Sequence, residues 1–247
     1  SELSEINNLL RVTGIGPSNA KKMVSNNITL KKLTEDTDQY WDTLNHHQKI
    51  GIKYFKDFEK KIPRIEIKSI ENKISKLLKK IDSKLNMYVC GSYRRQKTES
   101  GDIDVLITHE DIVNMSDLEN NSILSEIIDF LTDKKILVDH LTVNGNTKYM
   151  GVCKFTPKSY GRRIDIRFIP NESIGCALLY FTGSGEFNVN MRSYASKKGY
   201  KINEYNLLRN VGTKYIPVKI SSEKDIFDKL SLEYVEPKNR LPTVKFD

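Results

Sequence analysis

The stretch from Gly91 to Asp104 reads GSYRRQKTESGDID and follows an apolar segment that predicts a β-strand. Residues two apart in a strand point to the same side, so Asp102 and Asp104 should project together while Ile103 points into the core. Two neighbouring carboxylates repel each other unless cations lie between them. A pair of surface aspartates is the simpler alternative. The preceding Gly-Ser and its basic loop favour a metal site, because they place phosphate donors beside the carboxylates.

A third carboxylate lies in the segment RRIDIR, where Arg163, Asp165 and Arg167 share one face of a predicted strand. A surface ladder of ion pairs is the alternative, and such pairs contribute little to stability. With the aspartate pair upstream, we expect Asp165 to be a third metal ligand whose orientation Arg163 fixes. Three carboxylates can hold two Mg²⁺ ions about 3.5 to 4 Å apart, a geometry suited to phosphoryl displacement.

The Gly91-Ser92 pair, the ten-residue spacing to Gly101, the D-x-D and the third aspartate together resemble the nucleotidyltransferase superfamily. The segment LYFTGSGEFNVNMR, from Leu179 to Arg192, narrows the resemblance to the family X DNA polymerases, the DNA polymerase beta family. The resemblance implies a template-directed DNA polymerase that adds deoxynucleotides to a primer 3′-hydroxyl, with short-gap filling in DNA repair, such as base excision repair, as its role. Its expected partners are primer-template or gapped DNA and deoxynucleoside triphosphates, and its cofactors two Mg²⁺ ions, with Mn²⁺ able to substitute.

The resemblance also implies roles for single residues. Asp102 and Asp104 would bind both metals, Asp165 the catalytic one, and Arg163 would orient Asp165. The expected nucleotide and template contacts are Ser92, Arg95, Ser100, Gly101 and Lys61 at the triphosphate, Tyr180, Phe181 and Gly183 at the sugar, Asn188 at the base, Arg192 at the template, and Tyr205 in the closing movement around Arg167. Core packing is the alternative for Tyr180 and Phe181.

Three positions depart from the family pattern. Lys61 stands where an arginine is usual, which keeps the charge but loses bidentate geometry. Gly185 and Val189 stand where the DNA polymerase beta pattern has an acid and a lysine. Fewer polar and stacking contacts at these last two positions imply, on this resemblance, weaker nucleotide binding and altered fidelity.

The N-terminal segment LRVTGIGP, from Leu10 to Pro17, precedes a predicted helix that carries Lys21. Two glycines one residue apart at a helix start let backbone N–H groups approach a phosphate. The resemblance implies a helix-hairpin-helix that grips DNA through Gly14, Gly16 and Lys21, and whose carbonyls at Leu10, Val12 and Ile15 bind Na⁺ or K⁺. His46 and His47 are interpreted as helix-surface residues. The family's N-terminal lyase domain has no counterpart in the sequence, so no lyase activity is expected.

Periodicity predicts the fold class. Helices are expected at Ser18–Ser25, Leu30–Leu33, Asn45–Lys61, Ile67–Ile81 and Ser122–Leu131, and strands at Met87–Cys90, Ile103–Thr108, Leu141–Val143, Lys148–Phe155 and Arg163–Ile169, with helix and loop after Pro170. We therefore expect an α+β fold: a nucleotidyltransferase-type palm with a small antiparallel or mixed sheet at 64–172, flanked by a helix-hairpin-helix subdomain at 1–63 and an α-rich nucleotide-binding subdomain at 173–247.

Composition sets further bounds. The 247 residues include 40 Lys and Arg against 32 Asp and Glu, and the net charge of +8 favours a polyanionic partner. Cys90, Cys153 and Cys176 have no C-x-x-C spacing, so they are interpreted as reduced core residues. No apolar run nears the roughly 18 residues of a membrane span. We expect a monomer without a membrane partner. It should reside in a reducing intracellular compartment, the nucleus or the cytoplasm, and a viral origin is one alternative.

Two other functions compete with templated synthesis. A terminal transferase or an RNA nucleotidyltransferase would share the Gly-Ser and D-x-D core. An inactive DNA-binding scaffold would need no metal ligands. Asn188, Arg192 and the helix-hairpin-helix segment favour templated DNA synthesis, and the complete set of three aspartates disfavours the scaffold.

Overall fold

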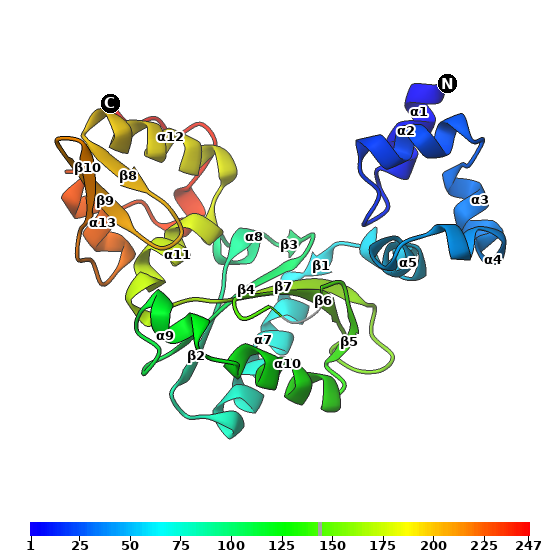
Figure 1. Ribbon diagram of the computed structural model, residues 1–247, viewed down its shortest axis with the longest axis horizontal. Coiled ribbons are helices and arrows are strands. Elements are labelled where there is room, and N and C mark those ends of the chain that lie inside the picture. The colour runs from blue at the N-terminus through cyan, green and yellow to red at the C-terminus, as the bar shows by residue number, and fades with distance from the viewer. Residues whose placement is uncertain (143–144) are drawn as a thin grey trace. The chain divides into compact units, whose positions relative to one another are not determined.

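The computed structural model describes residues 1–142 and 145–247, and these form two compact units, Ser1–Lys60 and Lys61–Asp247 (Figure 1). Each unit is considered by itself. The first is helical, and the second combines helices with small sheets, so the predicted α+β class is confirmed. Across the described residues, no helix combines the length and apolar character needed to cross a membrane.

The first unit consists of short helices around a small apolar core. They are α1 (Glu2–Leu9), α2 (Pro17–Ser25), α3 (Leu30–Glu35), α4 (Thr37–Tyr40), the 3₁₀ turn Trp41–Thr43, α5 (His46–Lys53) and α6 (Phe55–Phe58). Asn45 and Gln48 form a reciprocal cap at the start of α5. The prediction of one helix over Asn45–Lys61 is wrong. The backbone leaves the helical conformation at buried Tyr54, and the break lets Phe55 pack against the core.

The centre of the second unit is a five-stranded sheet in the order β2-β4-β7-β6-β5 (Figure 1). Its strands are β2 (Leu85–Val89), β4 (Ile103–His109), β5 (Leu137–His140), β6 (Lys148–Cys153) and β7 (Arg162–Phe168). Only β4 and β7 pair in parallel within it, and the other neighbours are antiparallel. A two-residue ladder joins β1 (Ile62–Pro63) to β3 (Glu99–Ser100).

Two helices, α7 (Arg64–Ile81) and α10 (Ile123–Asp133), pack on this sheet and on each other. The apolar stripe of α7 comprises Ile67, Ile70, Ile74 and Leu78, all fully buried in the same core as the strands. The strand predicted at Leu141–Val143 is wrong at its described residues. The strand there is β5, which ends at His140, while Val143, the last residue of the predicted strand, lies outside the described residues. The short helices α8 (Gly91–Arg94) and α9 (Met115–Glu119) complete this part.

After the turn Asn171–Ser173 come α11 (Ile174–Thr182) and α12 (Gly185–Lys197), then β8 (Tyr200–Ile202), β9 (Leu207–Val211), β10 (Lys214–Pro217), α13 (Glu223–Lys229) and a last turn, Pro237–Asn239. The three strands form an antiparallel sheet that the sequence did not predict. All four residues of β10 are exposed, so this strand lacks the alternation of apolar and polar residues that marks a half-buried strand.

A buried ion trio joins α8, α13 and the residues after the last turn. Glu223 accepts from Arg94 at 2.5 and 2.9 Å and from Arg240 at 2.5 Å, and the Arg240 side chain is fully buried. Burial would raise the pKa of the Glu223 carboxyl, but hydrogen bonds from Arg94 and the charges of both arginines hold it below its ordinary value. The trio therefore stabilises the fold in its charged form.

We predict that Glu223→Ala lowers the free energy of unfolding by about 3–5 kcal/mol at pH 7, because two guanidinium groups lose their buried partner. Urea unfolding would measure the loss. Since the folded-state pKa is depressed, this stabilisation is present above the ordinary glutamate pKa and disappears as the pH falls through the folded value. Asp228→Ala, which removes the exposed partner of Lys224, should cost at most about 0.5 kcal/mol. Equal losses in both variants would contradict the assignment.

Candidate active site

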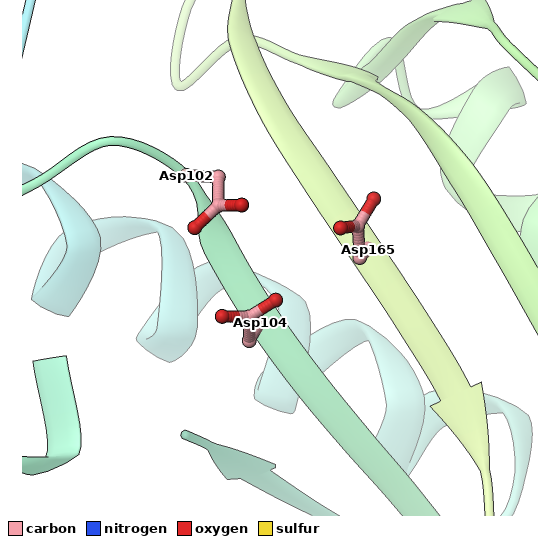
Figure 2. A group of neighbouring side chains, drawn as sticks. All are labelled: Asp102, Asp104 and Asp165. Atoms are coloured by element: carbon pink, nitrogen blue, oxygen red, sulfur yellow. The ribbon is translucent and has the colours of Figure 1, made fainter. Parts of the chain in front are cut away.

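Three carboxylates meet at the junction of β4 and β7 (Figure 2). Asp102 immediately precedes β4, Asp104 lies on β4, and the parallel register sets Asp104 directly beside Asp165 of β7. One oxygen atom from each side chain lies within 4.8 Å of the others. The register therefore gathers the three aspartates that the sequence singled out.

Nearby cations compensate the negative charge of the cluster only in part. Burial, followed by the charges of Asp102 and Asp165, raises the pKa of Asp104 to about 7. The pKa of Asp102 is also raised, first by burial and then by Asp165. Arg163 lowers both values without cancelling the rise. Oxygen donors under such repulsion are the ligand set that Mg²⁺ and Mn²⁺ prefer, so these residues fit divalent ions.

Arg163 is fixed beside the cluster by several bonds. Its Nη2 donates to Asp165 Oδ1 at 2.7 Å, and its Nη1 donates to the carbonyls of Gly151 at 2.7 Å and Ile164 at 3.2 Å. A guanidinium held by two carbonyls cannot follow the carboxylate, so Arg163 constrains the orientation of Asp165.

A cleft of about 740 Å³ opens above the cluster. It is lined by Gly91, Ser92, Arg95, Asp102, Asp104, Tyr180, Phe181, Thr182, Gly183, Gly185, Glu186, Asn188, Val189 and Arg192. Nine of these are predicted site residues, brought together from α8, the start of β4, α11, α12 and the turn between the two helices. The cleft thus joins the aspartate cluster to one face of α12.

The α8 side of the cleft supplies donors for an anion. Gly91 has φ +61°, and a Cβ there would lie 2.5 Å from Asp104 Oδ2, so only glycine fits. Ser92 Oγ bonds to the Oγ of buried Ser100 at 2.6 Å. Arg95 Nη1 donates to the Thr182 carbonyl at 2.7 Å, which fixes its guanidinium at the cleft wall.

The opposite wall comes from α11 and α12. The rings of Tyr180 and Phe181 meet edge to face with centroids 4.9 Å apart. Asn188 Nδ2 donates to the Tyr180 carbonyl at 2.7 Å, and the guanidinium of Arg192 lies 6.0 Å from the Tyr180 ring centroid. Tyr180 is 37% exposed, so its ring is an open wall of the cleft rather than a core residue.

Among the described residues of the second unit, six predicted site residues lie outside the lining: Lys61, Ser100, Gly101, Arg163, Asp165 and Tyr205. Lys61 Nζ lies 3.8 Å from the position of a Cβ on Gly101, and its charge lowers the pKa of Asp102, so both residues border the cluster. Tyr205 and Phe181 pack against the same apolar residues, and the guanidinium of Arg167 lies 4.7 Å from the Phe181 ring.

In the first unit, Gly14 has φ +93°, and a Cβ there would lie 2.8 Å from the backbone of His47 and Gln48. Gly16 caps α2 without a side chain, and a Cβ at Gly16 would meet no atom within 4 Å. Lys21 is exposed on the same helix. The Val12 carbonyl accepts from the Ile15 N–H at 3.1 Å. Gly14 thus lets the chain before α2 pack closely against the start of α5. Gly16 leaves the N-terminal end of α2 uncovered by side-chain atoms.

Sequence reasoning missed Thr182, Glu186 and Arg94. Thr182 and Glu186 line the cleft, and their place inside the motif from Leu179 to Arg192 was the available signal. Arg94 donates to Thr182 Oγ1 at 2.8 Å and to Glu223, so it points away from the cleft that Arg95 lines. The sequence around Arg94 and Arg95 contains no feature that shows which of the two side chains lines the cleft.

Comparison with known families covers both units. Residues 61–171 match the family model of the DNA polymerase beta palm, residues 177–241 that of the DNA polymerase beta thumb, and residues 7–59 the fingers domain of DNA polymerase lambda. The chain belongs to the family X DNA polymerases. The aspartate cluster thus lies in the palm of this family, and α12 in its thumb.

Individual relatives of this family X chain support the same family assignment. It is 37% identical to DNA polymerase lambda of Rattus norvegicus over 211 residues, and this aligned stretch covers 80% of this chain and 36% of that protein. It is 31% identical over 243 residues to DNA polymerase lambda of Arabidopsis thaliana, covering 93% and 45%. Repair DNA polymerase X of African swine fever virus is 29% identical over 156 residues, covering 63% and 82%. The chain thus spans less than half the length of the two lambda polymerases.

We predict that Asp104→Asn stabilises the metal-free protein at pH 8, raising its melting temperature by about 2–4 °C. The folded-state pKa of about 7 lies above the ordinary value of 3.8, so folding favours the neutral acid and the ionised carboxylate destabilises the fold. The difference should therefore be largest above pH 7 and vanish near pH 4. Calorimetry with a chelator would measure it. Asp111→Asn removes an exposed partner of Lys84 and should show no such gain; a gain there too would refute the prediction.

Proposed function

We propose that this chain is a template-directed DNA polymerase, which joins a deoxynucleotide to a primer 3′-hydroxyl by two-metal phosphoryl transfer. The observation that supports this most directly is the cluster of Asp102, Asp104 and Asp165, two of which, Asp102 and Asp104, line a cleft that also holds anion donors. Family membership makes DNA and deoxynucleoside triphosphates the expected substrates.

The aspartates would hold the divalent ions, Asp102 and Asp104 sharing both and Asp165 only the catalytic one. Bound Mg²⁺ or Mn²⁺ would supply positive charge to activate the attacking hydroxyl and neutralise the triphosphate. Arg163 keeps the Asp165 carboxylate in a fixed orientation. The triphosphate would be bound by Ser92, Arg95, Ser100 and the N–H of Gly101, with Lys61 adding charge.

Selection of the nucleotide would fall to the opposite wall. Tyr180 and Phe181 fill the space beside the sugar, where a filled pocket excludes a ribose 2′-hydroxyl, and Gly183 allows the close turn there. Asn188 would contact the base, and Arg192 the template strand. Tyr205 would repack around Arg167 when a correct pair closes the site. Tyr205 and Phe181 pack on the same apolar cluster, and the Arg167 guanidinium lies over the Phe181 ring, which supports this role.

The first unit would hold DNA without reading its sequence. Gly16 leaves the start of α2 open, so its N–H groups can approach a phosphate, and exposed Lys21 adds charge. Gly14, which permits the turn before it, completes the motif. A Na⁺ or K⁺ ion bound by the carbonyls of Leu10, Val12 and Ile15 belongs to the same proposal, and the family resemblance supports it.

The biological setting we propose is short-gap filling in DNA repair inside the cell, by a monomer acting on gapped DNA. Relatives named DNA polymerase lambda and Repair DNA polymerase X support the repair role. The three cysteines are buried and free, which suits a reducing compartment. Untemplated addition is the competing activity, and a primer offered with and without a template separates the two.

We predict that Asp165→Asn reduces primer extension on gapped DNA with Mg²⁺ by at least about 10³-fold, because the negative charge of the third carboxylate is lost while the fold and DNA grip remain. Extension assays would measure the rate, and fluorescence anisotropy should give a DNA affinity within about threefold of the unmodified chain. Asp111→Asn is the matched control and should extend normally. Loss of DNA binding together with activity would make Asp165 a structural residue.

We predict that Val189→Lys lowers the Michaelis constant for the correct nucleotide by about threefold to tenfold, because it adds a cation to the cleft. Val189 is 54% exposed and a Cβ on Gly185 would meet no atom within 4 Å, so both Val189→Lys and Gly185→Asp fit without displacing neighbours. Steady-state incorporation of right and wrong nucleotides would measure both variants. Unchanged constants would dispose of the idea that these two positions weaken binding.

A further inference from the structure

Helix α12 has two opposite faces. The cleft face carries residues at helical spacing: Gly185, Asn188, Val189 and Arg192. The back face repeats the spacing two positions later: Phe187, Asn190, Met191 and Tyr194. Two residues turn an α-helix by about 200°, so the second set points away from the cleft. Whatever holds the back face therefore sets how the cleft face is presented.

The segment Arg240–Phe246, here called the strap, covers the back face and lies alongside α12 (Figure 1). Asn190 Nδ2 donates to the carbonyls of Pro242 at 3.3 Å and Val244 at 3.0 Å. The ring of Phe246 lies 5.3 Å from that of Phe187 and 6.0 Å from that of Tyr194. Polar and aromatic contacts thus fix the strap to the middle and the later turns of the helix.

The strap also holds the start of the helix. The N–H of Ser184, the residue that caps α12, donates to the Arg240 carbonyl at 3.3 Å. From Ser184 to Tyr194 the helix rises about 15 Å, and six residues of extended chain reach about 20 Å. The strap is long enough to span this rise even with the turn at its centre, where the Val244 N–H donates to the Leu241 carbonyl at 3.2 Å. Its first residue is anchored because the buried Arg240 side chain bonds Glu223.

We infer that Phe246 and Asn190 are positioning residues, which fix the depth and tilt at which α12 presents Asn188 and Arg192 to the nucleotide and template. The inference rests on the proposed polymerase function. On the cleft face, Asn188 bonds the Tyr180 carbonyl, but Gly185 has no side chain and Val189 is exposed, so the packing that holds the helix comes from its back face. Misplacement of a substrate contact by about 1 Å can reduce a rate by about 100-fold, so small tilts of this helix matter.

The test is single-turnover nucleotide incorporation on gapped DNA by Phe246→Ala and Asn190→Ala. We expect the dissociation constant of the correct nucleotide to rise by about fivefold to twentyfold and discrimination against wrong nucleotides to fall. The affinity for DNA should stay within about twofold. Phe246→Tyr keeps the ring contacts and should restore the original values. Thr243→Ala, an exposed position on the strap, is the matched control and should change nothing.

Amide hydrogen exchange of residues 185–192 is a second readout that needs no activity. Both variants should exchange faster there, while α10 stays protected. If Phe246→Ala loses protection throughout the chain, the test rests on Asn190→Ala, which keeps the aromatic packing. If the unmodified chain extends primers and both variants bind and select nucleotides as it does, the inference is overturned and the proposed function stands. If the unmodified chain extends no primer, the proposed function fails, and unchanged exchange in α12 would overturn the positioning role separately.

Discussion

The parallel pairing of β4 with β7 is the constraint on which the rest of the second unit depends. Because Asp104 and Asp165 occupy paired positions in adjacent strands, the sheet cannot form without bringing like charges together. Apolar residues on the opposite face of the same strands, such as Ile103 and Ile164, are fully buried in the core, and their packing stabilises this register. Packing energy from one face of the sheet thus offsets electrostatic repulsion on the other.

The basic residues around the cleft reduce the repulsion between the aspartates without cancelling it. Arg163 is tied to two backbone carbonyls as well as to Asp165, and Arg95 to the Thr182 carbonyl, so neither is free to move onto Asp102 or Asp104. Arg94 is drawn to Glu223 instead. Groups fixed in advance need little rearrangement when charge arrives, which is how a preorganised site stabilises a transition state. The strap extends the same principle to the wall that faces the nucleotide.

Much of the palm could be predicted from sequence, because burial imposes regular patterns there. The alternation around Asp165 fixed its face, and the spacing of Ile67, Ile70 and Ile74 predicted α7. What escaped prediction depends on distant partners or lacks a pattern. The strands β8 to β10 are largely exposed, the break at Tyr54 reflects local packing, and the direction of Arg94 depends on Glu223, which lies 129 positions later. Phe246 likewise belongs to no periodic segment.

Gly91 has an evolutionary consequence. The Cβ that any other residue would add there lies 2.5 Å from a carboxylate oxygen of Asp104, so the turn at Gly91 and this acid compete for one volume. A larger residue at position 91 would displace this carboxylate, so the glycine cannot change by a single substitution while the aspartate stays. Descendants of this chain that keep the aspartate in place must therefore inherit the glycine with it.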